Sequence, residues 1–325
     1  MIERISTFFN PERFQGRHKK NSYFEGWYYK IIDATEKYAF AIIPAVSFDS
    51  KGNKHAFIQV LDGKKFTSQY HRFEIDTFAV TPGKLHVTIE NNEFTEDHFS
   101  IQLPEIQGNI QLINTKPWPK PFYSPGIMGP FAFIPFMECY HGIVSMDHEL
   151  MGSITYNGEV INFDHGRGYM EKDWGKSFPS AYFWMQCNHF TEPGNSIKCS
   201  VARIPWFNSQ FTGFICGLQL QDKLIQFTTY NGTKLIKSYA DTEKVELIMQ
   251  NKRYRIEITA HRDHATTLAS PILGHMEGKI EESMNAVIDV KLINLKTNQI
   301  IFEDSGRNGA LEVAGEIEKI SKFVN

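Results

Sequence analysis

Carboxylates and aromatic rings are concentrated in one central stretch of the chain. Glu171 and Asp173 stand just before Trp174, and the strand-like run 181–188 that follows contains further aromatic residues. A buried strand does not require the acids and a solvated loop does not require the tryptophans, so this stretch indicates a site. A carboxylic acid in an apolar pocket stays protonated at neutral pH and can still donate its proton. We therefore expect Glu171 to be the general acid, with Asp173 as the second candidate and Glu25, in an earlier aromatic segment, as the third.

Each of these acids also has a structural interpretation. Glu171 and its neighbour Lys172 could satisfy a turn, and Asp173 could cap the turn that follows it through its own backbone. Glu25 could form an ion pair with Lys30 or with an arginine. The catalytic and structural interpretations differ in whether the acid lies in an aromatic cavity or on the outside of the fold.

Aromatic rings would complete a site of this kind. Acids held among aromatic rings suggest a site that delivers a proton and tolerates positive charge, which needs electron-rich ring faces and the exclusion of water. The rings that we expect to line the ligand site are Trp27, Tyr28, Trp174, Tyr182 and Trp184. Gln186 and Asn188 share the strand face of Trp184 by period two, and they could orient a ligand hydroxyl or hydrogen-bond each other.

Histidines add one candidate for proton transfer and no metal centre. His141 could relay the proton of a ligand hydroxyl, or it could be a structural residue in its apolar segment. His261 and His264 resemble metal ligands, but no third ligand follows at a suitable spacing, so we predict no metal. The chain contains no phosphate-binding loop, no dinucleotide-binding glycine pattern and no esterase serine motif. The sequence therefore predicts chemistry without a cofactor.

Composition limits the partners and the location. The chain has 325 residues, a formal net charge of −3 and 42% hydrophobic residues, values typical of a soluble globular protein. This charge balance calls for neither nucleic acid nor an anionic membrane as a partner. The four cysteines show no metal-binding spacing, and we expect them to be reduced thiols. No apolar stretch follows Met1–Arg4, so no secretory signal is visible and we expect a cytoplasmic protein. Aromatic residues make up 14% and would fill large β cores or line a cavity for an apolar small molecule.

Hydrophobic periodicity predicts an all-β fold. Apolar and polar residues alternate over runs such as 85–89, 254–260 and 286–292, and turn pairs such as Asn157-Gly158 separate the runs. Sustained helical periodicity is nearly absent.

A faint internal repeat suggests how these strands are organised. An aromatic strand, a turn and a strand ending in Ile-Pro occur at 23–44 and again at 181–205. Two aromatic hairpins could match by chance, but a repeat at half the chain length predicts two antiparallel barrels in tandem. We expect the first barrel to cover residues 1–165, including a Pro- and Phe-rich connection at 117–136, and the second to cover residues 166–325.

Three sequence blocks resemble the signature blocks of the tocopherol cyclase family. They read F-E-G-W-Y-Y-K at 24–30, E-K-D-W-G-K-S-F-P at 171–179 and F-W-M-Q-C-N at 183–188, in family order along nearly the whole chain. The resemblance implies two lipocalin-like barrels with a ligand bound in or between them, and cyclisation of a prenylated phenol or quinol. Plant members have Asn where Asp173 stands and a differently placed histidine near His141, so the substrate does not carry over.

Two other functions fit the same pattern. A lipocalin-like carrier would keep the barrels without the acid chemistry. In a cyclase, protonation of an alkene in the substrate gives a carbocation that the phenol captures, whereas in a hydratase water would capture it. All three functions have an apolar small molecule as the partner. The stretch 131–136 could contact a membrane transiently to collect a lipid substrate, or it could be buried between the barrels.

Overall fold

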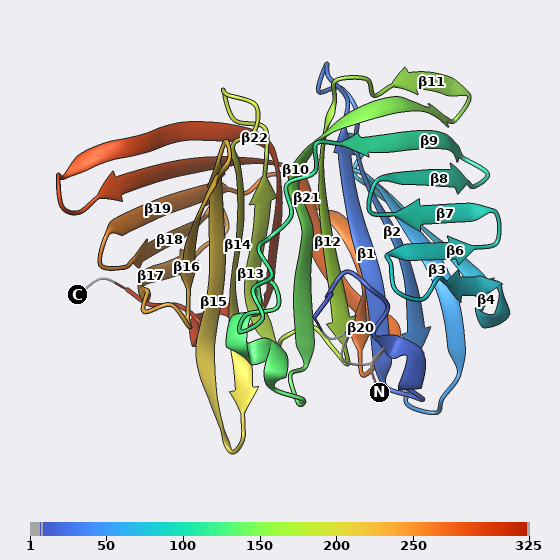
Figure 1. The fold of residues 1–325 in the computed structure, drawn as a ribbon, viewed down its shortest axis with the longest axis horizontal. Coiled ribbons are helices and arrows are strands. Elements are labelled where there is room, and N and C mark those ends of the chain that lie inside the picture. Colours follow the sequence, from blue (N-terminus) through green and yellow to red (C-terminus); the bar gives the residue numbers. More distant parts are fainter. Residues whose placement is uncertain (1–6, 8, 324–325) are drawn as a thin grey trace. The chain divides into compact units, whose positions relative to one another are not determined.

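The computed structural model describes residue 7 and residues 9–323, so the segment Met1–Arg4 lies outside the described residues. Strands dominate this part of the chain (Figure 1), as the alternating sequence pattern predicts. The short 3₁₀ turns are η1 (Gly16–His18), η2 (Ile75–Thr77), η3 (Gly129–Phe133) and η4 (Ile317–Lys319). No helix among the described residues is long and apolar enough to cross a membrane.

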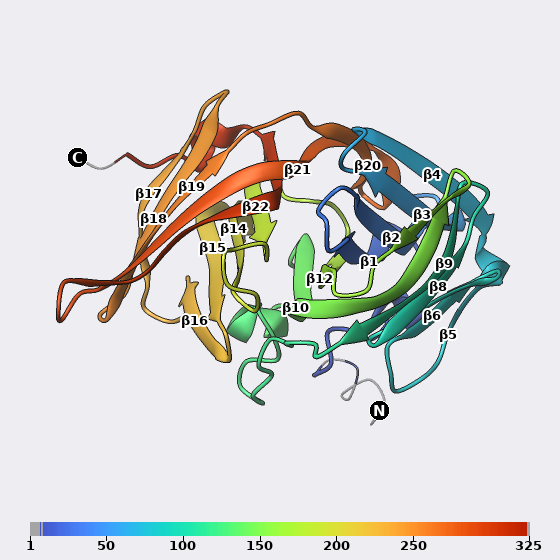
Figure 2. The same cartoon turned by 90° about the horizontal axis from the view of Figure 1, so that it is seen from above.

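The first sheet begins with β1, the aromatic strand at the start of the repeat. In their order along the sheet, the strands are β4 (Thr67–Glu74), β3 (Lys54–Asp62), β2 (Ala39–Phe48), β1 (Tyr23–Ile32), β12 (Arg167–Gly175), β10 (Cys139–Tyr156), β9 (Ile106–Ile113), β8 (His98–Gln102), β7 (Asn92–Thr95), β6 (His86–Ile89) and β5 (Phe78–Val80), with β11 (Glu159–Asn162) paired to β10. The pairings are antiparallel and the sheet curls strongly (Figure 2). Its end strands β4 and β5 are consecutive in the chain and joined by η2, so the sheet is a barrel left open at this one step.

The second sheet repeats this plan. Its strands, in order, are β16 (Lys223–Thr228), β15 (Ser209–Leu220), β14 (Ser196–Trp206), β13 (Ala181–Cys187), β22 (Gln299–Gly315), β21 (His275–Asn294), β19 (Tyr254–His261), β18 (Lys244–Gln250) and β17 (Lys234–Ala240), with β20 (Thr266–Ile272) paired to β21. In each sheet the first strand pairs with both the second and the last, and consecutive strands form the open ends. The internal repeat therefore marks equivalent strands, β1–β2 and β13–β14, of two similar antiparallel, nearly closed barrels.

Contacts divide the chain into two compact units. The first runs to Phe178 and includes Ala269–Lys279, and the second takes Pro179–Leu268 and the chain from Ile280 onward. The boundary expected at 165 falls before β12, which the structure keeps in the first sheet between β1 and β10. The segment 269–279 belongs to the first unit through contacts such as the Gly274 N–H donating to the Lys176 carbonyl at 2.7 Å.

Alternation fills the core of each unit from one face of its strands. In the first unit Trp27, Tyr29 and Ile31 of β1 point into the core. In the second unit Phe183 and Met185 of β13 do the same. The residues that alternate with them therefore face the other way, which decides where the candidate site residues lie. The four cysteines are free thiols and all are buried.

Candidate active site

Three neighbouring strands of the first unit carry most of the candidate residues. β12 pairs with β1 on one side and with β10 on the other, and Asp173 lies opposite both Gly26 and His141. Residues directly opposite each other in an antiparallel sheet point to the same face. Glu171, Asp173, His141 and Tyr28 therefore share one face of this sheet. Glu25, which lies opposite Trp174, shares the other face.

On the first face, Glu171, His141 and Asp173 form an acid–histidine cluster. His141 Nδ1 lies 3.0 Å from Glu171 Oε1, and the same nitrogen contacts Asp173 Oδ1. The Glu171 side chain is only 1% exposed, whereas those of His141 and Asp173 are 19% and 21% exposed. Two carboxylates that reach one imidazole nitrogen repel each other unless a proton lies among them. The cluster is therefore suited to hold a proton inside the fold.

Tyr169 completes this cluster, and the sequence analysis did not identify it. Its hydroxyl donates to Glu171 Oε2. Burial, followed by the charge of Glu171, raises the pKa of Tyr169 well above its usual value. Tyr169 thus keeps its proton and holds the Glu171 carboxyl in place. The signal was present in the sequence, because Tyr169, Glu171 and Asp173 alternate along one strand face.

The opposite face holds a buried ion pair instead of a free acid. Lys172 Nζ lies 2.5 Å from Glu25 Oε1, and both side chains are fully buried. Glu25 also accepts a hydrogen bond from the Tyr23 hydroxyl at 2.6 Å and from the Gln15 N–H at 2.8 Å. The Glu25 carboxylate is thus saturated with donors, and the structure separates it from Glu171 and Asp173 by the thickness of the sheet.

This ion pair fastens the segment 11–15 across the barrel. Lys172 Nζ donates to the carbonyl of Pro11 at 2.8 Å and to that of Arg13. Trp27 Nε1 donates to the carbonyl of Glu12 at 2.8 Å. Burial lowers the pKa of Lys172, and the charge of Glu25 opposes this effect. The segment is therefore held by buried polar contacts from β1 and β12.

The Lys172 ammonium also lies over two of the aromatic rings that we expected to line the ligand site. Its ammonium lies 4.5 Å from the ring centroid of Trp174 and 5.3 Å from that of Trp27. Tyr140 stacks on Trp174 with an interplanar angle of 9° and a centroid distance of 5.5 Å. Trp27 is completely buried. These two tryptophans already engage a positive charge of the protein itself.

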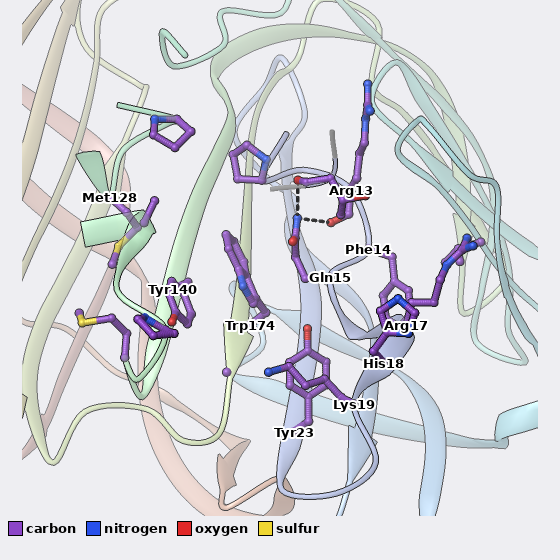
Figure 3. A pocket seen from close by; sticks show the side chains of 18 of the residues that line it. Arg13, Phe14, Gln15, Arg17, His18, Lys19, Tyr23, Met128, Tyr140 and Trp174 are labelled. Carbon is purple, nitrogen blue, oxygen red and sulfur yellow. Dashed lines mark hydrogen bonds between the residues drawn. The ribbon is translucent and has the colours of Figure 1, made fainter. Parts of the chain in front are cut away.

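A cavity of about 680 Å³ opens beside this segment in the first unit. Figure 3 shows Tyr140 and Trp174 on one side and Arg17, His18 and Lys19 across from them. Its volume lies within the range of about 300–1,000 Å³ that is usual for small-molecule sites. His141 is also among the lining residues, so the acid–histidine cluster reaches the cavity wall.

The remaining predicted residues lie in the second unit. Tyr182, Trp184 and Gln186 alternate along β13 on the face opposite to its core, and Asn188 follows the strand. The Tyr182 hydroxyl donates to Glu312 Oε2 at 2.7 Å. Asn188 Oδ1 lies 3.0 Å from His189 Nδ1, a partner that the sequence analysis did not consider. Their assignment to ligand binding stays a prediction.

A group of residues in the first unit that shares His141 and Asp173 with the acid–histidine cluster could hold a metal ion. One sulfur, nitrogen or oxygen atom from each of Cys139, His141 and Asp173 lies within 4.8 Å of the others. No local motif marks this group, because its members come from two strands that pair only in the fold. His261, which we considered as a metal ligand, instead contacts Asp289 Oδ2 at 2.8 Å.

Comparisons with curated proteins give related sequences over part of the chain. A rice (Oryza sativa subsp. japonica) protein described as a probable chloroplastic tocopherol cyclase is 27% identical over 150 residues, which are 45% of this chain and 32% of that protein. A chloroplastic tocopherol cyclase from Zea mays is 27% identical over 109 residues, 32% of this chain and 23% of the maize protein. The chain thus matches about a third or less of these relatives.

Solved structures share the fold over nearly the whole chain. CghA, crystallised with Sch210972, is similar with a TM-score of 0.59 and 9% identity, covering 91% of this chain and 89% of CghA. A protein described as a putative AttH from Nitrosomonas europaea has a TM-score of 0.54 and 15% identity, with coverage of 90% and 92%. At these identities the similarity shows the fold alone.

A family profile adds the assignment that these comparisons leave open. The profile described as tocopherol cyclase-like matches residues 20–315, which include β1, β10, β12 and β13. The match covers well over half of the chain. The chain therefore belongs to the tocopherol cyclase-like family.

Proposed function

We propose that the protein is a cofactor-independent isomerase that closes a ring in a prenylated phenol or quinol, or in a related apolar polyene. The observation that carries this proposal is the cluster of Glu171, His141 and Asp173, with a buried carboxyl that is held by Tyr169. Family membership supports it, because chloroplastic tocopherol cyclases are among the relatives.

The chemistry follows from a proton held at the wall of a cavity. The cluster donates a proton to one alkene carbon, and the C–C π electrons form the new C–H bond. The phenol oxygen attacks the resulting tertiary carbocation and forms the C–O bond, and its proton returns to the cluster. His141 is the residue that both contacts Glu171 and lines the cavity, so we assign it the proton transfer. No atom is gained or lost, and no oxidant or cofactor is required.

Incubation with prenylated quinols in D2O tests the proposal. An isomeric product with one new non-exchangeable deuterium, detected by mass spectrometry, would support proton-initiated cyclisation. Glu171→Gln and His141→Asn should each reduce turnover about 10²–10⁴-fold, the usual contribution of a general acid. Ligand affinity should stay within about tenfold, because these changes remove a proton donor rather than the apolar contact area.

A matched control comes from a second histidine–glutamate pair, whose glutamate lies on β10, the strand of His141. Glu149 in β10 contacts His165 Nδ1 at 2.8 Å, but these side chains are 35% and 85% exposed. Glu149→Gln should therefore retain full turnover. Full activity in both Glu171→Gln and Asp173→Asn would refute our assignment of the acid.

One observation favours a carrier as the second candidate. None of the described residues that line the cavity is an aspartate or glutamate, so a ligand could bind there without meeting an acid directly. Unchanged quinol recovered bound to the protein would support this function. A product heavier by one D2O would instead indicate a hydratase, in which water captures the carbocation.

A further inference from the structure

The charge of the cavity wall contrasts with the charge of the chain. The protein has a formal net charge of −3, yet the described residues that line the cavity include lysines and arginines and no aspartate or glutamate. These basic residues are Arg13, Arg17, Lys19, Lys20, Lys84 and Lys176. The accumulation is therefore local and does not follow from the composition.

The basic residues form an exposed rim around an apolar interior. The side chains from Arg17 to Lys20 are exposed, as are those of Lys84 and Lys176. In contrast, Met128, Met137 and Tyr23 are at most 6% exposed. Together with Trp174 and Tyr140 they give the interior of the cavity an apolar and aromatic surface (Figure 3).

Two of these lysines are available for a ligand. Among the described residues, no carboxylate lies within 4.0 Å of the ammonium group of Lys20 or of Lys84. The Lys19 ammonium lies 5.6 Å from the ring centroid of Tyr23. Lys176 acts on Glu138, where burial raises the carboxyl pKa and the lysine opposes that shift. Lys20 and Lys84 thus present positive charge to the solvent at the rim.

We propose that this cavity binds an amphipathic organic anion. The apolar body would lie against Tyr140, Trp174 and Met128, and a carboxylate, sulfonate or phosphate group would contact Lys20 and Lys84 at the rim. What happens to the bound anion rests on the proposed function: the substrate would be an apolar polyene or prenylated phenol that carries an acidic group. An uncharged prenylquinol would leave Lys20 and Lys84 without a counter-charge.

A matched pair of fluorescent probes tests this proposal on the intact chain. Anilinonaphthalene sulfonate and phenylnaphthylamine share their aromatic skeleton, and only the first carries an anionic group. We expect the sulfonate to bind at least about tenfold more tightly at low salt, because several rim charges contribute up to about fivefold each. High salt should reduce this preference, since exposed charges are screened.

Charge reversal at the rim identifies the residues responsible. The double variant Lys20→Glu/Lys84→Glu should weaken sulfonate binding about tenfold or more and leave phenylnaphthylamine binding within about twofold. Lys37→Glu/Lys51→Glu is the matched control, because these two exposed lysines of the same unit lie outside the cavity and give the same change in net charge. The control should bind both probes like the unmodified protein.

Three outcomes would overturn the proposal: equal affinity for the two probes, an unchanged preference in the rim variant, or the same loss in the control. Vesicles of anionic and of zwitterionic lipid provide a further arm. Rim-dependent binding to anionic vesicles, without rim-dependent binding of the soluble sulfonate, would assign the charges to a membrane surface and refute the cavity site. These readouts do not depend on turnover, so binding by an inactive Glu171→Gln variant separates this proposal from the proposed function.

Discussion

Glu25→Gln should destabilise the first unit strongly although it removes only one charge. Glu25 and Lys172 are fully buried and 2.5 Å apart, so the substitution leaves the lysine ammonium without its nearest counter-charge. Breaking a buried pair in this way costs about 3–5 kcal/mol, because an uncompensated charge stays in the interior. The remaining contacts of Lys172, to the carbonyls of Pro11 and Arg13 and to two tryptophan rings, carry no formal charge and offset only part of that cost.

Urea unfolding followed by tryptophan fluorescence measures this effect, since Trp27 and Trp174 lie beside the ion pair. The double variant Glu25→Gln/Lys172→Met removes both charges and should recover most of the stability lost in the single variant. Limited trypsin digestion supplies a second readout. The segment that contains Arg13 is held by Lys172 and should become cleavable in Glu25→Gln under native conditions.

An ion pair in the second unit is the control. Lys237 and Glu246 lie 2.9 Å apart, but their side chains are 26% and 23% exposed. Glu246→Gln should therefore cost only about 0.2–1 kcal/mol. A cost for Glu25→Gln no larger than this, or a double variant whose cost equals the sum of its two single variants, would refute our reasoning about the buried pair.

Three further predictions concern the cluster and a buried histidine. Burial lowers the pKa of His148 from 6.5 to about 3, so the unfolded chain binds a proton at this histidine first as the pH falls. The free energy of unfolding should therefore drop by about 1.4 kcal/mol per pH unit below pH 6.5. Urea titrations of His148→Gln should show a smaller slope. Tyr169→Phe removes the hydrogen bond to Glu171 and should lower turnover about tenfold while circular dichroism stays unchanged, and full turnover would argue against a role in holding the acid. Dialysis against a chelator should leave turnover unchanged; a loss that zinc restores would reassign Cys139, His141 and Asp173 as metal ligands.

The strands could be predicted from the sequence because the alternation of apolar and polar residues is a property of neighbouring positions. Ala286, Ile288, Val290 and Leu292 are all buried in β21, as period two requires. The repeat predicted two similar antiparallel barrels because it marks their first strands. The same period could have identified Tyr169, two residues before Glu171, as a member of the acid cluster.

The pairing of strands distant in the chain determines which candidate residues contact each other, and this could not be predicted from the sequence. Whether Glu25 shares a face with Glu171 depends on the register of β1 against β12, which are about 140 residues apart in the chain. One step of register would exchange the faces. The contact between His141 and Asp173 likewise requires β10 to pair with β12. The basic rim combines residues from three separate segments, 17–20, 84 and 176, so no local sequence motif predicts it.

The position of Lys172 also limits where a carbocation could form. An ammonium 4.5 Å from the Trp174 ring uses the attraction that this ring could offer to a second positive charge, and two like charges at one ring would repel each other. If the proposed function is correct, the alkene must therefore be protonated on the side of His141 and away from Lys172. Capture by the phenol oxygen should follow proton transfer without a long-lived intermediate. Lys172→Met combined with Glu25→Gln frees the ring faces of Trp27 and Trp174. If the freed rings then stabilise a long-lived carbocation, this variant should lose a proton from it and release alkene by-products. The unmodified protein should not form these by-products.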